Sequence, residues 1–186
     1  MTTLIDDFTT GPFSVKLTDE LASRSDTQKG DMLGGSRVTS VTLDVSRNHR
    51  QPLTLDLGQA VSSDGGPDGM NLTVPVDAPA SVTFVYGSNG NVRVDWSTAS
   101  ALVVDIAAYT SFLATTYAIV LFSDGGRRSR FNATFAAPPK EQRLTLPFKT
   151  LQPDAPGADV DLRNVTAIDF VFTFNGSARF RSFKVI

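Results

Sequence analysis

Carboxylate and guanidinium groups occupy unusual places in this sequence, inside stretches where apolar and polar residues alternate. Asp is disfavoured in the middle of a β-strand, yet five aspartates take such positions: Asp44, Asp56, Asp95, Asp105 and Asp169. Arg93 precedes Asp95 by two residues, and Arg179 precedes Arg181 by two, so each pair shares one side of its strand. On neighbouring strands, such groups would line a groove that hydrogen-bonds hydroxyls or positions a general acid. The alternative is a solvated sheet face with cross-strand Arg–Asp pairs of small energetic value.

If the hydroxyls in such a groove belong to a sugar, the site also needs an aromatic platform for the apolar face of the pyranose ring. Trp96 shares its parity with Val92 and Val94, which favours burial in the core, with only an edge left for a ligand. Tyr109 shares its parity with Asp105, so the two predict a mixed cleft face. The candidate ligand-binding residues are Arg93, Asp95, Trp96, Asp105 and Tyr109. If the protein is an enzyme, Asp95 and Asp105 are the candidate catalytic acids.

Composition excludes several other kinds of chemistry. The absence of Cys removes disulfides, thiolate zinc sites and a Cys nucleophile, and a single histidine, His49 in a polar turn, cannot supply a site that needs two. The net charge of −2 gives no basic face for nucleic acid. No run is long and apolar enough to span a membrane. The N-terminus lacks the basic start of a signal peptide, so we expect an extracellular or periplasmic protein if a leader precedes Met1 and a cytoplasmic protein otherwise.

The elements that must position these groups are β-strands. Seventeen of the nineteen acidic residues are Asp and only two are Glu, a balance typical of turns rather than helices. Period-two alternation recurs along the chain, for example in 53–57 and 168–174, and 82–86 and 92–96 flank a turn. Two segments, 102–108 and 117–122, are apolar on both sides and predict central strands or, around the Thr-rich stretch between them, a short helix. The sequence predicts one all-β domain over residues 1–186, an antiparallel sandwich of jelly-roll type.

Three stretches resemble a known family. They are Leu4-Ile5-Asp6-Asp7-Phe8-Thr9-Thr10-Gly11-Pro12-Phe13, Gly30-Asp31-Met32-Leu33-Gly34-Gly35-Ser36-Arg37, and Asn164 to Phe170 with the terminal strand Ser177 to Ile186. They are similar to the opening strand, the turn after it and the closing strands of carbohydrate-binding-module-like (galactose-binding-like) jelly rolls, including bacterial exported proteins of that shape. The resemblance implies neighbouring first and last strands, a glycan ligand and a structural calcium ion, with Asp6 and Asp7 as its ligands. The loop from Asp64 to Gly69 is an alternative calcium site, although it lacks EF-hand spacing.

Three functions follow from these observations. The first is a non-catalytic module that binds a carbohydrate or small ligand on a polar concave sheet face. The second is a calcium-dependent cyclase or isomerase of a natural-product pathway, with an Asp general acid, because jelly rolls of this resemblance have been recruited for such chemistry. The third is a structural or adhesive surface protein. The sequence leaves the ligand and the oligomeric state open.

Overall fold

The computed structural model describes residues 2–18, 20–44, 52–57, 69–74, 79–88, 90, 92–110, 115–135 and 142–186. Its described part is built from strands and four single-turn 3-10 helices, and contains no helix that could cross a membrane. The strands are β1 (Thr3–Asp6), β2 (Phe13–Leu17), β3 (Ser23–Lys29), β4 (Ser36–Leu43), β5 (Leu53–Leu57), β6 (Met70–Val74), β7 (Ala80–Tyr86), β8 (Ala101–Thr110), β9 (Thr115–Ser123), β10 (Arg127–Phe135), β11 (Gln142–Pro147), β12 (Gln152–Pro153), β13 (Val165–Phe174) and β14 (Gly176–Val185).

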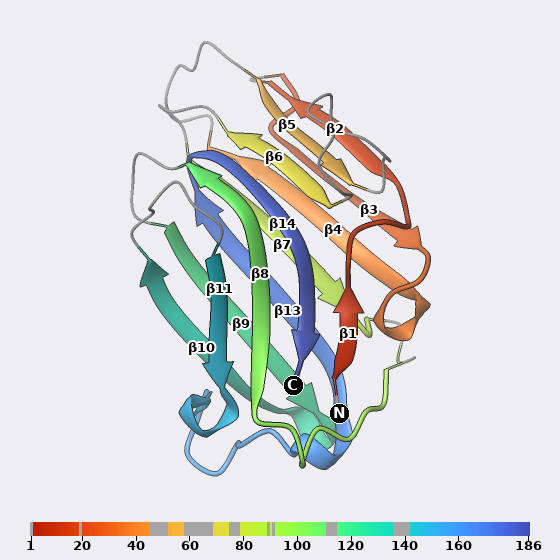
Figure 1. Cartoon of the computed structure of the whole chain (residues 1–186), viewed down its shortest axis with the longest axis vertical. Helices are drawn as coiled ribbons and strands as arrows, with labels where there is room; N and C mark the ends of the chain where they lie inside the picture. Colours follow the sequence, from red (N-terminus) through yellow and green to blue (C-terminus); the bar gives the residue numbers. More distant parts are fainter. Residues whose placement is uncertain are drawn as a thin grey trace.

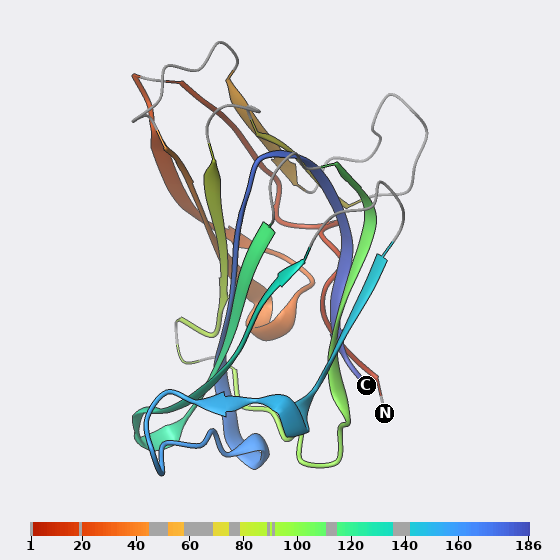
Figure 2. The same ribbon diagram turned by 90° about the vertical axis from the view of Figure 1, so that its left-hand side faces the viewer.

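The strands form two antiparallel seven-stranded sheets packed face to face (Figures 1 and 2). The front sheet of Figure 1 has the order β11-β8-β14-β6-β5-β2, with β1 also paired to β14. The back sheet has the order β12-β10-β9-β13-β7-β4-β3. The predicted β-sandwich of jelly-roll type is confirmed. Pairing of β1 with β14 places the two chain ends side by side.

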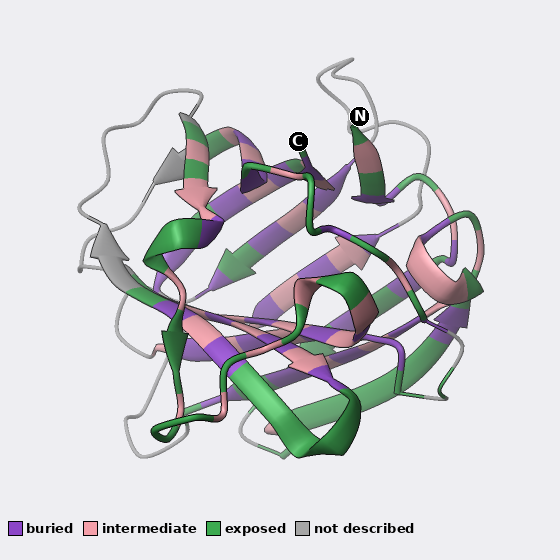
Figure 3. Cartoon of the chain, turned by 90° about the horizontal axis from the view of Figure 1, so that it is seen from below, coloured by how far each residue is buried: buried purple, intermediate pink, exposed green. Residues whose placement is uncertain are grey.

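Period-two alternation produces the core between the sheets. In β5 and β7 every second residue is buried and the intervening ones are partly exposed, as the alternation predicts. Figure 3 shows this banding of buried and exposed positions along the strands. An aromatic cluster joins the layers: Phe183 of β14 stacks on Phe170 of β13 with centroids 4.0 Å apart and meets Phe8 edge-on at 4.9 Å. Long-range packing of rings therefore fixes how the two sheets face each other.

The segment 92–96 does not form the strand that its alternation predicts after the turn at 87–90. Tyr86 ends β7, which pairs with β4 and β13, and among the described residues between β7 and β8 the only strand pairing is an isolated bridge between Val94 and Val165. Gly87 adopts a φ of +87°, and a side chain there would collide with the carbonyl of Thr166. The chain therefore leaves the sheet at Gly87, which only glycine allows without strain.

Candidate functional site

The five mid-strand aspartates do not line one groove. Asp56 and Asp105 lie on the outer face of the front sheet, which we call the front face, and Asp169 lies on the outer face of the back sheet, which we call the back face. Asp95 lies in the loop before β8, and Asp44 follows the end of β4. Alternation assigns each residue to a side of its own strand, but it does not say which sheet that strand joins.

Arg93 and Asp95 both lie in the exposed loop between β7 and β8, whereas Asp105 lies within β8. Arg93 pairs with Asp124 at 3.2 Å, and 68% of its side chain is exposed. The carboxylate of Asp95 accepts a hydrogen bond from the Ser97 backbone N–H at 2.8 Å. Hydrogen bonds from Ser97 lower the pKa of Asp95. Arg93 and Asp95 therefore each make an ordinary surface contact with another residue and not with each other.

Of the two aromatic candidates, Trp96 contributes to the core rather than to a platform. Trp96 is 2% exposed and its ring stacks on Phe148 at 6.3 Å, which confirms the prediction of burial and argues against a sugar platform. Tyr109 pairs with Ala178 through its backbone, and its side chain lies outside the described residues, as do His49 and residues 64–68 of the alternative calcium loop. The backbone register between β8 and β14 shifts between Arg179 and Ser182. The prediction that Tyr109 and Asp105 share one side of their strand assumed regular alternation, and a register shift of this kind cannot be read from the sequence.

Asp105 is the centre of an ionic cluster on the front face. Arg143 of β11 donates from Nε to one carboxylate oxygen at 2.9 Å, and Lys184 and Ser182 of β14 donate to the other, Ser182 at 3.2 Å. Burial alone would raise the pKa of Asp105, but the hydrogen bonds and charges of Lys184 and Arg143 outweigh it and keep the pKa below its usual value.

These pKa directions bear on catalysis. A general acid must carry a proton at the working pH, so enzymes raise the pKa of carboxyl groups used in that role. The pKa values of Asp95 and Asp105 are both lowered, and Asp105 is held by two cations. The geometry therefore does not favour either residue as the general acid of a cyclase.

A polar hollow opens on the front face where β6, β14 and β8 run side by side. It has a volume of about 260 Å³ and is lined by Asn71, Leu72, Thr73, Ala108, Ser177, Ala178 and Arg179. The hollow forms where the side chains are small, at Ala108, Ser177 and Thr73. Beside them, the Arg179 guanidinium donates a hydrogen bond from Nε to the Asn71 side-chain oxygen at 2.8 Å. Register shifts in β14 adjoin the hollow, as is common beside binding sites.

The hollow continues as a polar row across the sheet. Strand register places Ala108, Arg179, Asn71, Asp56 and Ser14 side by side on five neighbouring strands. Ser14 donates to the Asp56 carboxylate at 2.5 Å. With strands spaced about 4.8 Å apart, the row spans about 19 Å. Asp56 and Arg179 belong to the mid-strand charges that predicted a polar groove, but they were not among the five candidate ligand-binding residues, and Asn71 was in neither set.

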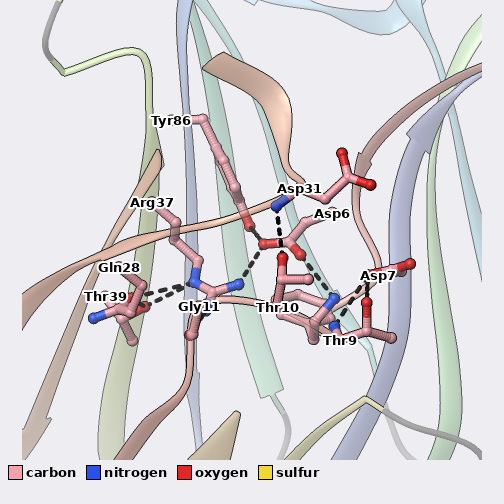
Figure 4. A network of polar contacts seen from close by, with 11 residues as sticks. Asp6, Asp7, Thr9, Thr10, Gly11, Gln28, Asp31, Arg37, Thr39 and Tyr86 are labelled. Carbon is pink, nitrogen blue, oxygen red and sulfur yellow. Dashed lines mark hydrogen bonds and ion pairs between the residues drawn. The ribbon is translucent and has the colours of Figure 1, made fainter. Parts of the chain in front are cut away.

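Asp6, the last residue of β1, lies in a buried network (Figure 4). One carboxylate oxygen accepts the Phe8 backbone N–H at 2.7 Å; the other accepts Arg37 Nη1 at 2.5 Å and the Tyr86 hydroxyl at 2.7 Å. Arg37 also donates to the Gly11 carbonyl at 2.9 Å. Burial raises the pKa of Asp6, and Arg37, Tyr86 and Phe8 act against that rise.

Arg37 supplies the positive charge that a calcium ion would bring to Asp6. Asp7 is also engaged, since its carboxylate accepts the Thr9 backbone N–H at 3.0 Å and the Thr9 hydroxyl at 2.6 Å. The described residues contain no group of three or more metal-binding side chains. Because calcium takes six to eight oxygen ligands, this geometry argues against the predicted calcium site at Asp6 and Asp7.

Removal of divalent cations should therefore leave the fold unchanged. An ion bound only by the native state stabilises it by mass action, and the Asp6–Arg37 pair needs no such ion. We expect the same Tm by differential scanning calorimetry in excess chelator and in excess calcium. A Tm that falls in chelator and recovers with calcium would show that a metal site exists after all.

Comparison with known proteins gives a fold likeness. No protein-family profile matches the chain, and no curated protein does. The chain is similar to the family 11 carbohydrate-binding module of a cellulosomal cellulase from Clostridium thermocellum, at 15% identity over 100% of this chain and 94% of that one, with a TM-score of 0.46. It is also similar to a family 30 carbohydrate-binding module, at 14% identity over 100% and 98% of the chains, with a TM-score of 0.48.

A third structure, a family 61 module in complex with β-1,4-galactotriose, shares 10% identity over 80% of this chain and 87% of that one, with a TM-score of 0.36. The predicted resemblance to carbohydrate-binding-module-like sandwiches is confirmed as a likeness of fold. Identities and TM-scores this low carry no conclusion about the ligand of this chain.

Proposed function

We propose that the chain is a non-catalytic module that binds a glycan on its front face, across the polar row that contains the hollow. The observation that supports it is the row itself. Arg179 offers guanidinium donors, Asn71 both a donor and an acceptor, and Asp56 carboxylate acceptors. Sugar hydroxyls both donate and accept hydrogen bonds, so a mixed set of this kind suits them.

The shape of the row favours an extended ligand over a compact one. The small residues that line the hollow within it, Ala108, Ser177 and Thr73, are exposed and do not close over the hollow. A row about 19 Å long that crosses five strands can follow several linked sugar rings, whereas a small ligand would be held only at the hollow.

The test is affinity electrophoresis of the whole chain through gels that contain a panel of neutral and charged polysaccharides. We expect at least one polysaccharide to retard the protein. Arg179→Ala should weaken that binding about 10- to 150-fold, since hydrogen bonds to charged groups contribute about 1.5–3 kcal/mol.

Arg93→Ala is the matched control, because it removes the same kind of side chain from the exposed loop. It should bind like the unmodified protein. Equal binding by Arg179→Ala, or loss of binding in Arg93→Ala alone, would move the site away from the front face. If no polysaccharide slows the migration of the protein, the proposal that the chain binds a glycan is wrong.

A further inference from the structure

The back face carries an apolar strip with one acidic residue at its centre. The outward residues of β9 and β13 include six that are partly exposed, Ala118, Val120, Phe122, Ala167, Asp169 and Val171, and the exposed Thr116 and Thr173 lie opposite each other at one end of the strip. Asp169 lies directly between Val85 of β7 and Val120 of β9. A carboxylate surrounded in this way loses hydration without a compensating contact, which is costly.

Within the described part of the chain, neither a hydrogen bond nor an ion pair holds Asp169. The outward residues of β7 are Ser81, Thr83 and Val85, those of β9 carry no charge, and its neighbours on β13 are Ala167 and Val171. Burial raises the pKa of Asp169 to about 6. The strip therefore contains a carboxylate whose charge a cation from outside the chain would stabilise.

The cation nearest in register lies two strands away. Asp169 is opposite Val120, and Val120 is opposite Arg130 of β10, so the three form one row on the back face. Two strand spacings separate Asp169 from Arg130 by about 10 Å. Arg130 pairs with Asp154 at 2.5 Å, on the side away from Asp169, and 43% of its side chain is exposed.

We propose that the back face is the interface between two copies of this chain, related by a two-fold axis that runs along β9 over Val120, so that Asp169 of each copy pairs with the partner's Arg130. A two-fold axis in the interface plane carries one end of the row onto the other, and it makes the row Asp169–Val120–Arg130 complementary to itself. The apolar residues of β9 and β13 then pack beneath the aliphatic parts of the arginines.

This arrangement has a consequence for the proposed glycan face, although it does not depend on it. The back face and the front face lie on opposite sides of the sandwich. A dimer would therefore present two front faces pointing away from each other, and such a pair can bridge two polymer chains. Bivalent binding raises avidity only where both sites can be occupied together.

Association should depend on pH. Pairing with the partner's Arg130 favours the ionised carboxylate, so the dimer is stable above the pKa of about 6 and weakens as Asp169 takes up a proton below it. The charged groups nearest on the face, Arg128 and Arg130, both pair with Asp154.

The test is sedimentation equilibrium of the whole chain over a range of concentrations, at neutral pH and at about pH 5. We expect a dimer at neutral pH that dissociates more readily in acid. Asp169→Arg should be monomeric, and the double variant with Asp169→Arg and Arg130→Asp should dimerise again, because the charges are exchanged. Thr42→Arg, which adds a charge to an exposed position of the same face away from the row, is the control and should remain dimeric.

Should Asp169→Arg fail to fold by circular dichroism, Asp169→Asn replaces it and should weaken the dimer at least about tenfold. A monomer at all concentrations overturns the proposal. So does a dimer that persists in Asp169→Arg, which would place the interface elsewhere. The proposal is also wrong if the double variant folds but does not dimerise. In that case a different protein, with its own lysine or arginine facing Asp169, would be the better partner for the back face.

Discussion

Replacement of Arg37 by Met should lower the free energy of unfolding by about 3–5 kcal/mol at neutral pH, because it leaves the Asp6 carboxylate buried without its cation. Both side chains are 0% exposed, so water cannot compensate the lost charge. The Gly11 carbonyl loses a donor at the same time. Chemical denaturation followed by circular dichroism measures the difference.

Two further results distinguish this pair from general damage to the core. In Arg37→Met the cation no longer opposes the effect of burial, so the pKa of Asp6 should rise further. The variant should recover part of its stability as the pH falls, because the carboxyl then becomes neutral. Arg93→Met breaks the exposed pair with Asp124 and should cost less than about 1 kcal/mol. Losses of similar size in the two variants would contradict the account.

Truncation of Phe183 to Ala should be equally severe, at about 3–5 kcal/mol. Phe183 is 0% exposed and lies against Phe170, Phe8 and Phe84, so its removal leaves a cavity between the two sheets and the loop after β1. Ile186→Ala, near the same end of the chain but 36% exposed, is the control and should change stability little. A loss below about 1 kcal/mol in Phe183→Ala would show that the cluster does not join the layers.

Alternation predicts the strands of this chain well because it reports a local property, the side of the strand on which each residue lies. The segments 53–57 and 168–174 are strands as expected. The segment 92–96 alternates equally well but is a loop, since strand formation needs a partner and Gly87 turns the chain away from β7. Pairing is a long-range property that alternation does not contain.

The same limit explains the candidate sites. Asp6 was predicted to bind calcium, but its partner Arg37 lies 31 residues further along the chain. Two of the three stretches that resemble jelly-roll proteins, 4–13 and 30–37, meet in this network, so the resemblance in these segments has a structural reason. Asp105 was predicted on a polar face and is there, but Arg143 and Lys184 reach it from strands whose neighbourhood only the fold defines.

The most direct test of the central claim is to map the ligand on the protein by nuclear magnetic resonance. The claim is that a glycan lies across the polar row of the front face. Titration of the isotope-labelled chain with the oligosaccharide of the retained polysaccharide should shift the backbone amide signals of Asn71, Ala108 and Arg179, and leave those of Asp95 and Asp169 in place. Shifts confined to the loop around Asp95 or to the back face, with the signals of the polar row unchanged, would contradict it.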